Sequence, residues 1–290
     1  MVTTIDTRTA TPVDPQRIQR VQEAAKRIRR RALDMGEVQG QGYIGQALGV
    51  ADVLAVAYTD QLRLRPEDPS CLDRDRFLLS IGHYAIALYA ALAEAGVIAE
   101  SELETYGADG SRLPMSAMAT YTPGVEISGG SLGHGLGIAV GMALGLRHQG
   151  NDTPRVFNLL SDGELNEGST WEAAMSAAHH RLGNLTAIID VNALQADGPT
   201  DGVMRIEPVE DKWRAFGWNT QRVDGNSIPD LLRAFDAAAA TDAHTPAALI
   251  CDTKVGKGVP MLESREKAHF MRVEEHEWQI ARDQLEAQAR

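Results

Sequence analysis

The chain has 290 residues, 43% of them hydrophobic and 23% charged, which is enough for one large α/β domain or two small ones with a substantial core. The formal net charge of −12 argues against non-specific binding to nucleic acid or to an anionic membrane surface. The two cysteines, Cys71 and Cys251, form neither a disulfide framework nor a ligand cluster, so we expect a reducing compartment.

The N-terminal segment MVTTIDTRTATPVDP lacks the apolar core of a signal peptide. No apolar run reaches the roughly 18 residues of a membrane-spanning helix. We therefore expect a cytoplasmic protein that does not enter a membrane. Residues 1–14 are predicted to form a disordered or extended tail, and residues 15–290 to form one domain, because the sequence contains no internal repeat and no low-complexity linker.

The first predicted element is an amphipathic helix from Gln16, in which apolar residues recur at helical spacing as far as Ala32. Its basic segment KRIRRR (26–31) could bind an anion, but we favour a solvated helix face. A glycine-rich loop is expected next, with a second helix from about Val50 to Leu62. The glycines of this loop are Gly36, Gly40, Gly42 and Gly45.

Beyond the second helix, strand-like and helical patterns alternate. The predicted strands are Phe77–Ser80, Val156–Ser161, Thr186–Val191, Thr220–Val223 and Ala247–Asp252. The predicted helices are Ala85–Ala95, Leu132–Arg147, Ser169–Leu182 and Ile228–Ala240, and the charged segment from Glu274 also has a helical pattern. Ser169 and Glu172 are spaced as a capping box. The alternation predicts an α/β fold with a mostly parallel sheet flanked by helices on both faces.

Two of these strands end in polar residues within the stretch LLSDGELNEGSTWEAAMSAAHHRLGNLTAIIDVNALQADG (159–198). Asp162 follows the first strand and Asn192 the second, so both are expected at the carboxyl edge of the sheet, where ligands bind. The Asp162 carboxylate, the Asn192 side-chain carbonyl and the backbone carbonyl near Leu194 are hard oxygen donors that suit Mg²⁺ completed by phosphate oxygens. Gly163 would let its amide donate to such a phosphate.

Other interpretations of this stretch are weaker. Taken singly, Asp162 and Asn192 are ordinary polar strand ends. An EF-hand starting at Asp162 is excluded, because its glycine would fall at Glu167 and its bidentate glutamate at Ala173.

The combination resembles the thiamin-diphosphate signature of transketolases, in which Gly-Asp-Gly is followed further along the chain by Asn; here Ser161 replaces the first glycine. The resemblance covers nearly the whole chain. It is to the N-terminal, diphosphate-binding half of transketolase, as found in split transketolases whose halves are separate polypeptides. It implies the thiamin-diphosphate-binding fold, thiamin diphosphate and Mg²⁺ as cofactors, and transfer of a two-carbon ketol unit.

Further segments match the family in order. RFLLSIGHYAIALYAAL (76–92) places His83 at a histidine that contacts the cofactor diphosphate, and GVEISGGSLGHGLGIAVGMALG places Gly130 and Leu132 over the cofactor. TKVGKGVPMLESREKAHF ends near a second diphosphate-side histidine, His269.

Within the signature itself, the resemblance puts Gly163 and Glu164 beside the cofactor. Glu167 matches a glutamate that communicates between the two active sites of the family.

The substrate positions depart from the family pattern. Tyr43 replaces a histidine in the segment GYIGQALGVAD, Ser116 aligns with another histidine, and His134 stands in place of a glutamine. The two missing histidines bind substrate and transfer protons in the family. Either Tyr43 and His134 take over, or the substrate needs no such relay, as with a 2-oxo acid activated by decarboxylation. The residues expected to act in catalysis are His83, Glu167, His269, Tyr43 and His134.

Full-length transketolases continue into a pyrimidine-binding half, which supplies the glutamate that helps to generate the cofactor's nucleophile. The resemblance therefore implies a separate C-terminal, pyrimidine-binding partner subunit and a heterotetramer with two copies of each subunit. Its small-molecule substrates would be a ketose or 2-oxo acid donor and an aldehyde-type acceptor.

Two alternatives remain at this point. One is the α-subunit of a 2-oxo-acid decarboxylating enzyme, which shares the metal motif; the segments GSRLP…TPGVE and TKVGKG favour transketolase. The other is a non-catalytic, cofactor-binding interaction subunit. The presence of Asp162, Asn192, His83 and His269 together argues against it.

Overall fold

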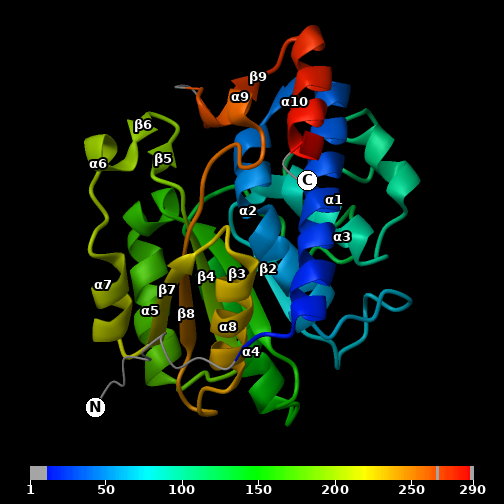
Figure 1. Cartoon of the computed structure of the whole chain (residues 1–290). Coiled ribbons are helices and arrows are strands. Elements are labelled where there is room, and N and C mark those ends of the chain that lie inside the picture. Colours follow the sequence, from blue (N-terminus) through cyan, green and yellow to red (C-terminus); the bar gives the residue numbers. More distant parts are fainter. Residues whose placement is uncertain (1–11, 266–267, 288–290) are drawn as a thin grey trace.

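Five parallel strands form the central sheet of the protein, whose computed structural model describes residues 12–265 and 268–287 (Figure 1). The strand order is β2–β3–β4–β8–β7, with bounds Arg76–Leu79 (β2), Val156–Ser161 (β3), Leu185–Val191 (β4), Ala247–Asp252 (β8) and Asn219–Asp224 (β7). Ser161 is opposite Asp190, and Asp190 is opposite Cys251, so the three central strands end at one edge. The predicted parallel sheet is confirmed. Residues 1–11 of the predicted tail lie outside the described residues.

Helices cover both faces of the sheet, as predicted. One layer contains α1 (Pro15–Gln39), α2 (Ile44–Val56), α3 (Ala85–Glu94) and α8 (Ile228–Ala239); the other contains α4 (Gly135–His148), α5 (Gly168–His179) and α7 (Val209–Ala215). Alternate strand residues face the two layers: Phe157 and Leu159 pack with the first, Val156 and Leu160 with the second. Burial on both faces explains why these strands are continuous apolar runs. Helix α7 was not predicted.

Short elements lie around the carboxyl edge of the sheet. They are β1 (Gln41–Gly42), which pairs antiparallel with β9 (Met271–Arg272), β5 (Leu194–Gln195), which pairs with β6 (Gly198–Pro199), and the helical turns α6 (Thr200–Val203) and α9 (Pro260–Glu263). Helix α10 (Glu275–Ala287) packs along α1 through Trp278, Ala281 and Leu285 (Figure 1). No helix in residues 12–265 and 268–287 combines the length and apolarity needed to cross a membrane.

The predicted glycine-rich loop is shorter than expected, because α1 continues through Gly36 and α2 already begins at Ile44. A Cβ on Gly36 would lie 3.0 Å from the Ile44 side chain, and one on Gly45 would lie 2.6 Å from Val255. These two glycines therefore permit close packing of the helices. Glycine is needed for its backbone at the left-handed C-cap Gly40 (φ 67°) and at Gly42 (φ 149°).

The predicted capping box at the start of α5 is wrong. The helix begins at Gly168 with Glu167 as its N-cap, and no side chain caps it. Ser169 instead donates its hydroxyl to the carbonyl of Gly133 at 2.9 Å, because the two helix starts lie against each other. This hydrogen bond ties α5 to the glycine-rich loop before α4.

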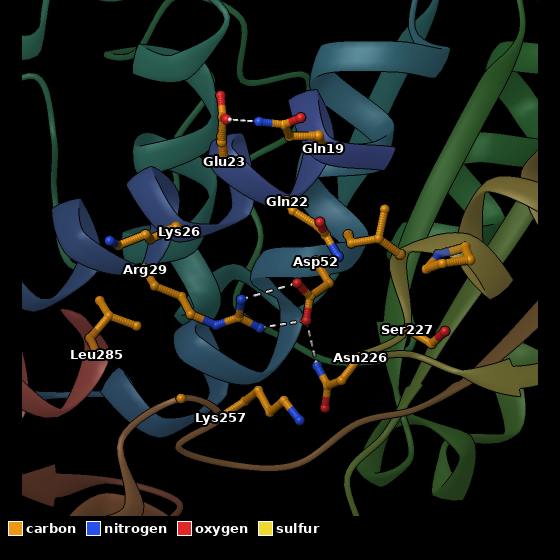
Figure 2. Close-up of a pocket in the computed structure, with 13 residues that line it drawn as sticks. Gln19, Gln22, Glu23, Lys26, Arg29, Asp52, Asn226, Ser227, Lys257 and Leu285 are labelled. Atoms are coloured by element: carbon orange, nitrogen blue, oxygen red, sulfur yellow. Dashed lines mark hydrogen bonds and ion pairs between the residues drawn. The ribbon is translucent and has the colours of Figure 1, made fainter. Parts of the chain in front are cut away.

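The prediction of a solvated face for the basic segment of α1 is wrong for Arg29, which is buried. Its guanidinium donates to both carboxylate oxygens of Asp52 and to the carbonyl of Leu48, and Asn226 donates to the same carboxylate at 2.9 Å (Figure 2). These groups line an open cavity of about 770 Å³ between α1, α2 and the start of α8. Lys26, Arg27 and Arg30 pair with carboxylates at the surface, as Lys26 does with Glu286, whereas Arg31 forms a largely buried pair with Glu94.

Candidate active site

Asp162 and the loop after β4 lie against each other at the carboxyl edge of the sheet. Asp162 Oδ2 accepts the amide of Ala193 at 2.8 Å and the hydroxyl of Thr200 at 3.2 Å. Its Oδ1 accepts the amide of Gly163 at 2.8 Å. Ala193 has φ 60°, a left-handed conformation that costs free energy for a residue with a Cβ, and its hydrogen bond to Asp162 holds it there. The structure thus brings together the two segments from which metal ligands were predicted.

The Asn192 side chain has its orientation fixed by a buried polar network. Its Nδ2 donates to Asp190 at 2.7 Å and to the hydroxyl of Tyr84 at 3.0 Å, and Tyr84 itself donates to Asp190 at 2.8 Å. Thr253 donates to the other oxygen of Asp190. With Nδ2 used on this side, Asn192 Oδ1 lies on the loop side, where it accepts the amide of Leu194 at 3.0 Å. We did not predict this network from the sequence, although Asp190 and Asn192, two residues apart at the end of a strand, could have indicated it.

The carboxyl groups of Asp162 and Asp190 are both buried here, and neither has a basic partner among the residues that the structure describes. Burial and the neighbouring Asp190 charge raise the pKa of Asp162 to about 7, and burial raises the pKa of Asp190 as well. A divalent cation would neutralise this charge, and the oxygen donors of Asp162, Asn192 and Leu194 suit Mg²⁺. The described residues contain no group of three or more His, Cys, Asp or Glu side chains able to hold a metal, so ligand oxygens would have to complete the coordination.

The rings of His83, His269 and Tyr43 lie together as the corners of a triangle. The ring centroids of the two histidines are 5.8 Å apart, and Tyr43 lies 4.5 Å from His83 and 5.5 Å from His269. Burial, together with the charge of His269, lowers the pKa of His83 to about 4, and burial also lowers the pKa of His269. Both imidazoles are therefore neutral at pH 7 and can each accept or donate a proton.

Two further residues join this group that sequence reasoning missed. Gln46 lies with its Nε2 3.1 Å from His269 Nδ1, and it is buried on the first turn of α2. Its position three residues after Tyr43, on the same helix face, was a usable signal. Phe270 places its ring 5.1 Å from that of Tyr43, and nothing in the sequence marked it.

The glycine-rich loop before α4 is held by Glu164, whose side chain is fully buried. Glu164 Oε1 accepts the amide of Gly133 at 2.8 Å and the hydroxyl of Ser80, and Ser80 in turn accepts the amide of Gly135 at 3.0 Å. The structure therefore shows Glu164 positioning this loop, and the contact with the cofactor that the resemblance implies stays a prediction. Gly130 and Leu132, predicted to lie over the cofactor, are part of the same loop.

The remaining predicted residues lie around the glycine-rich loop and the starts of α4 and α5. Ser116 donates its hydroxyl to the carbonyl of Gly129 at 3.1 Å, so it supports the glycine-rich loop. His134 is exposed at the N-cap of α4, with Nδ1 3.1 Å from the carbonyl of Leu132. Glu167 is exposed at the N-cap of the adjoining α5. Among the described residues, His134 makes no ring contact with the Tyr43 group, and the structure gives no support to its taking over the role of a missing histidine.

Comparison with known proteins identifies relatives along nearly the entire chain. The family described as "Transketolase, thiamine diphosphate binding domain" matches residues 20–289. An uncharacterized transketolase family protein of Sinorhizobium fredii is 66% identical over 256 residues, covering 88% of this chain and 91% of the relative. The 6-deoxy-6-sulfo-D-fructose transketolase subunit of Clostridium sp. is 37% identical over 268 residues, covering 92% of this chain and 96% of that subunit.

Solved structures give the same picture. The transketolase of Campylobacter jejuni superposes with a TM-score of 0.84 at 28% sequence identity, covering 94% of this chain. This chain covers 43% of that transketolase, so it spans less than half of the solved enzyme.

Proposed function

Because the chain belongs to the transketolase family, we propose that it is the diphosphate-binding subunit of a two-component transferase that moves a two-carbon unit with thiamin diphosphate and Mg²⁺. The observation that carries the proposal is that the loop of Asp162 and Asn192 lies beside the pair His83 and His269, because Asn192 donates to the hydroxyl of Tyr84, the residue after His83. Cys71 and Cys251 are free thiols, in keeping with a proposed cytoplasmic location.

We assign the following roles to the residues of this chain. Asp162, Asn192 Oδ1 and the carbonyl of Leu194 would hold Mg²⁺, and the metal would hold the cofactor diphosphate. Thiamin diphosphate, when bound, supplies the carbon nucleophile that cleaves and forms carbon–carbon bonds. His83 and His269, both neutral at pH 7, would donate hydrogen bonds to the diphosphate.

Gln46 would act on this chemistry through His269. The side-chain amide of Gln46 lies against Nδ1 of His269, so it fixes the orientation of the imidazole ring and the direction in which Nε2 of His269 points. Glu164 and Ser80 would act through the glycine-rich loop that they hold.

The pyrimidine-binding half would come from a partner subunit, as the name of the Clostridium relative suggests for that protein. Helices α4 and α5 provide a surface for assembly. Ile138 on α4 and Met175 on α5 are large apolar side chains with exposed fractions of 44% and 50%. The stripe of Gly137, Gly141 and Gly145 on α4 faces open space, because a Cβ on any of them would meet no described atom within 4 Å. Exposed apolar groups beside small residues are typical of closely packed interfaces.

We expect Gly141→Leu to prevent assembly while leaving the chain folded. Leucine raises helix propensity by up to about 1 kcal/mol relative to glycine, so the free chain should be at least as stable. A side chain in the stripe would nevertheless hold a second helix away, and we expect the apparent dissociation constant of the complex to rise at least about tenfold, which is about 1.4 kcal/mol. Sedimentation velocity of the mixture with the partner measures this change.

Ala239→Leu, an exposed position on α8 in the opposite layer, is the matched control and should assemble normally. Normal assembly of Gly141→Leu would show that this stripe lies outside the interface.

The proposed function is tested by calorimetric titration of thiamin diphosphate with Mg²⁺. The titrant is added first to this chain alone and then to its mixture with the proposed pyrimidine-binding subunit. Tight binding only in the mixture supports a site shared between subunits. Absence of binding in both samples would contradict the proposal and favour a non-catalytic role.

A further inference from the structure

We propose that Gln46 is a positioning residue that holds His269 in the tautomer with its proton on Nε2. His269 then presents an N–H donor toward the proposed diphosphate site and has no free lone pair there with which to take a proton from substrate. This inference rests on the proposed function, because it specifies what one histidine of that site can do.

The contact between the two side chains is buried. Gln46 has an exposed fraction of 1%, and its Nε2 lies 3.1 Å from Nδ1 of His269. A side-chain amide nitrogen only donates hydrogen bonds, so the Nδ1 that faces it must offer a lone pair. A neutral imidazole carries one ring proton, and that proton is therefore on Nε2.

The other side of the imidazole agrees with this assignment. Burial lowers the pKa of His269, and a hydrogen bond with the backbone of Leu194 opposes this effect by raising it. A bond that favours the protonated ring has the backbone carbonyl as its acceptor, so the imidazole contributes an N–H. Since Nδ1 faces Gln46, this N–H is the one on Nε2. It points to the loop of the predicted metal ligands, where a diphosphate oxygen would be an acceptor.

The backbone holds the two residues together although they are far apart in the sequence. A Cβ on Gly45, the residue before Gln46, would lie 3.1 Å from the carbonyl oxygen of Ala268, the residue before His269. Strand β1 pairs with β9, which begins two residues after His269. The start of α2 is thus fixed against the segment that carries the histidine, and a site supported in this way keeps its geometry.

The second polar atom of the Gln46 amide argues against a purely structural role. Oε1 is buried and has no hydrogen-bond partner among the residues that the structure describes. A buried acceptor without a donor costs free energy, which offsets the gain from the hydrogen bond to His269. Methionine has a similar size and neither polar group. We therefore expect Gln46→Met to leave the free energy of unfolding about unchanged.

The test reads the tautomer from the nitrogen chemical shifts of His269. Nitrogen–proton correlation NMR spectra of the full chain with isotope-labelled histidine distinguish protonated from unprotonated ring nitrogens, and His269→Asn identifies the signals. We expect a protonated Nε2 and an unprotonated Nδ1 in the wild type. In Gln46→Glu the carboxylate only accepts hydrogen bonds, so Nδ1 should become protonated. A proton on Nδ1 already in the wild type would mean that Oε1 faces the ring, and would overturn the proposal. An unprotonated Nδ1 in Gln46→Glu would also overturn it.

Gln46→Met provides a second readout. We expect both tautomers of His269 in the free chain, and binding of thiamin diphosphate to the assembled enzyme should weaken about tenfold, the lower end of the range for outer-shell partners of metal-binding histidines. Gln221→Met is the matched control, because Gln221 is a half-buried glutamine on the edge strand β7 whose Nε2 donates to the carbonyl of Ala234 at 3.5 Å. This control should bind the cofactor normally.

The outcomes separate the role of Gln46 from the proposed function. Full cofactor affinity in Gln46→Met would overturn the role. A large loss of stability in urea denaturation, with the tautomer unchanged, would overturn it as well and make Gln46 a structural residue. If the wild-type mixture binds no cofactor, the proposed function has failed, and the tautomer measured in the free chain still decides whether Gln46 sets the proton of His269.

Discussion

Asp162→Ala is expected to abolish Mg²⁺-dependent binding of thiamin diphosphate to the assembled enzyme. Asp162 is the one carboxylate of the proposed ligand set, and it also holds the amide of Ala193 in the strained loop that carries Asn192 and Leu194. The substitution therefore removes a ligand and loosens the others. Since changes to outer-shell groups alone cost roughly 10- to 100-fold in metal affinity, we expect a loss of more than about 100-fold.

The measurement is calorimetric titration of the cofactor at several Mg²⁺ concentrations. Asp201→Ala is the matched control, because Asp201 lies on the nearby α6 with its carboxylate exposed and only a 3.8 Å ion pair with Arg205. The control should bind normally. Unchanged affinity in Asp162→Ala would remove Asp162 from the metal site.

The same carboxyl group predicts how metal binding depends on pH. Without metal, the pKa of Asp162 is raised from 3.8 to about 7, so the site is half protonated near neutral pH. Mg²⁺ must displace that proton, and its apparent affinity should rise with pH until about pH 7 and then level off. The stability of the metal-free chain should change in the opposite direction. Because the pKa of Asp162 is higher in the folded than in the unfolded chain, the free energy of unfolding falls as pH rises from about 4 to about 7. Metal-free Asp162→Ala should show a smaller loss in a series of thermal unfolding curves, because the pKa of Asp190 is raised as well.

Asp52→Ala is expected to lower the free energy of unfolding by about 3–5 kcal/mol, the cost of breaking a buried ion pair by removing one partner. Arg29 is only 8% exposed, and its guanidinium would lose its carboxylate partner inside the layer of α1 and α2. Asn226 would lose one of its hydrogen bonds to α2 at the same time (Figure 2). Urea denaturation followed by circular dichroism measures the change.

Two further variants serve as controls for Asp52→Ala. Asp34→Ala removes an exposed carboxylate paired with Arg30 at i,i+4, and it should change stability by no more than about 0.5 kcal/mol. The double variant Arg29→Met with Asp52→Leu removes both charges and should recover most of the loss. If Asp52→Ala proved as mild as Asp34→Ala, the Arg29–Asp52 pair would contribute little to stability.

The sheet could be predicted from the sequence because its central strands are buried on both faces. Such strands are short apolar runs with sharp polar ends, and Val156–Ser161 and Ala247–Asp252 were predicted with their observed bounds. The approximate site followed from the same ends, since Asp162 and Asn192 could only lie at one edge of a parallel sheet. The family resemblance added His83 and His269, whose types and spacing alone indicate no function.

The missed features depend on contacts between distant segments. Gly36 and Gly45 were interpreted as loop residues. Glycine is needed at these positions because they pack closely against Ile44 and Val255, and that packing is visible only in three dimensions. Phe270 gains its meaning from Tyr43, a partner on a segment far away in the chain. The role of Glu164 Oε1 in holding the amide of Gly133 likewise joins two segments that are far apart in the sequence.

The short pairing of β1 with β9 has a consequence for how this chain can change over generations. It brings into ring contact two residues, Tyr43 and Phe270, that are encoded far apart. A recombination event between them would join a Tyr43 from one ancestor to a residue 270 from another, and so produce a mismatched pair of side chains. Lineages that change one of the two rings should therefore exchange both positions together, and paired substitution at 43 and 270 is the trace that such a history would leave.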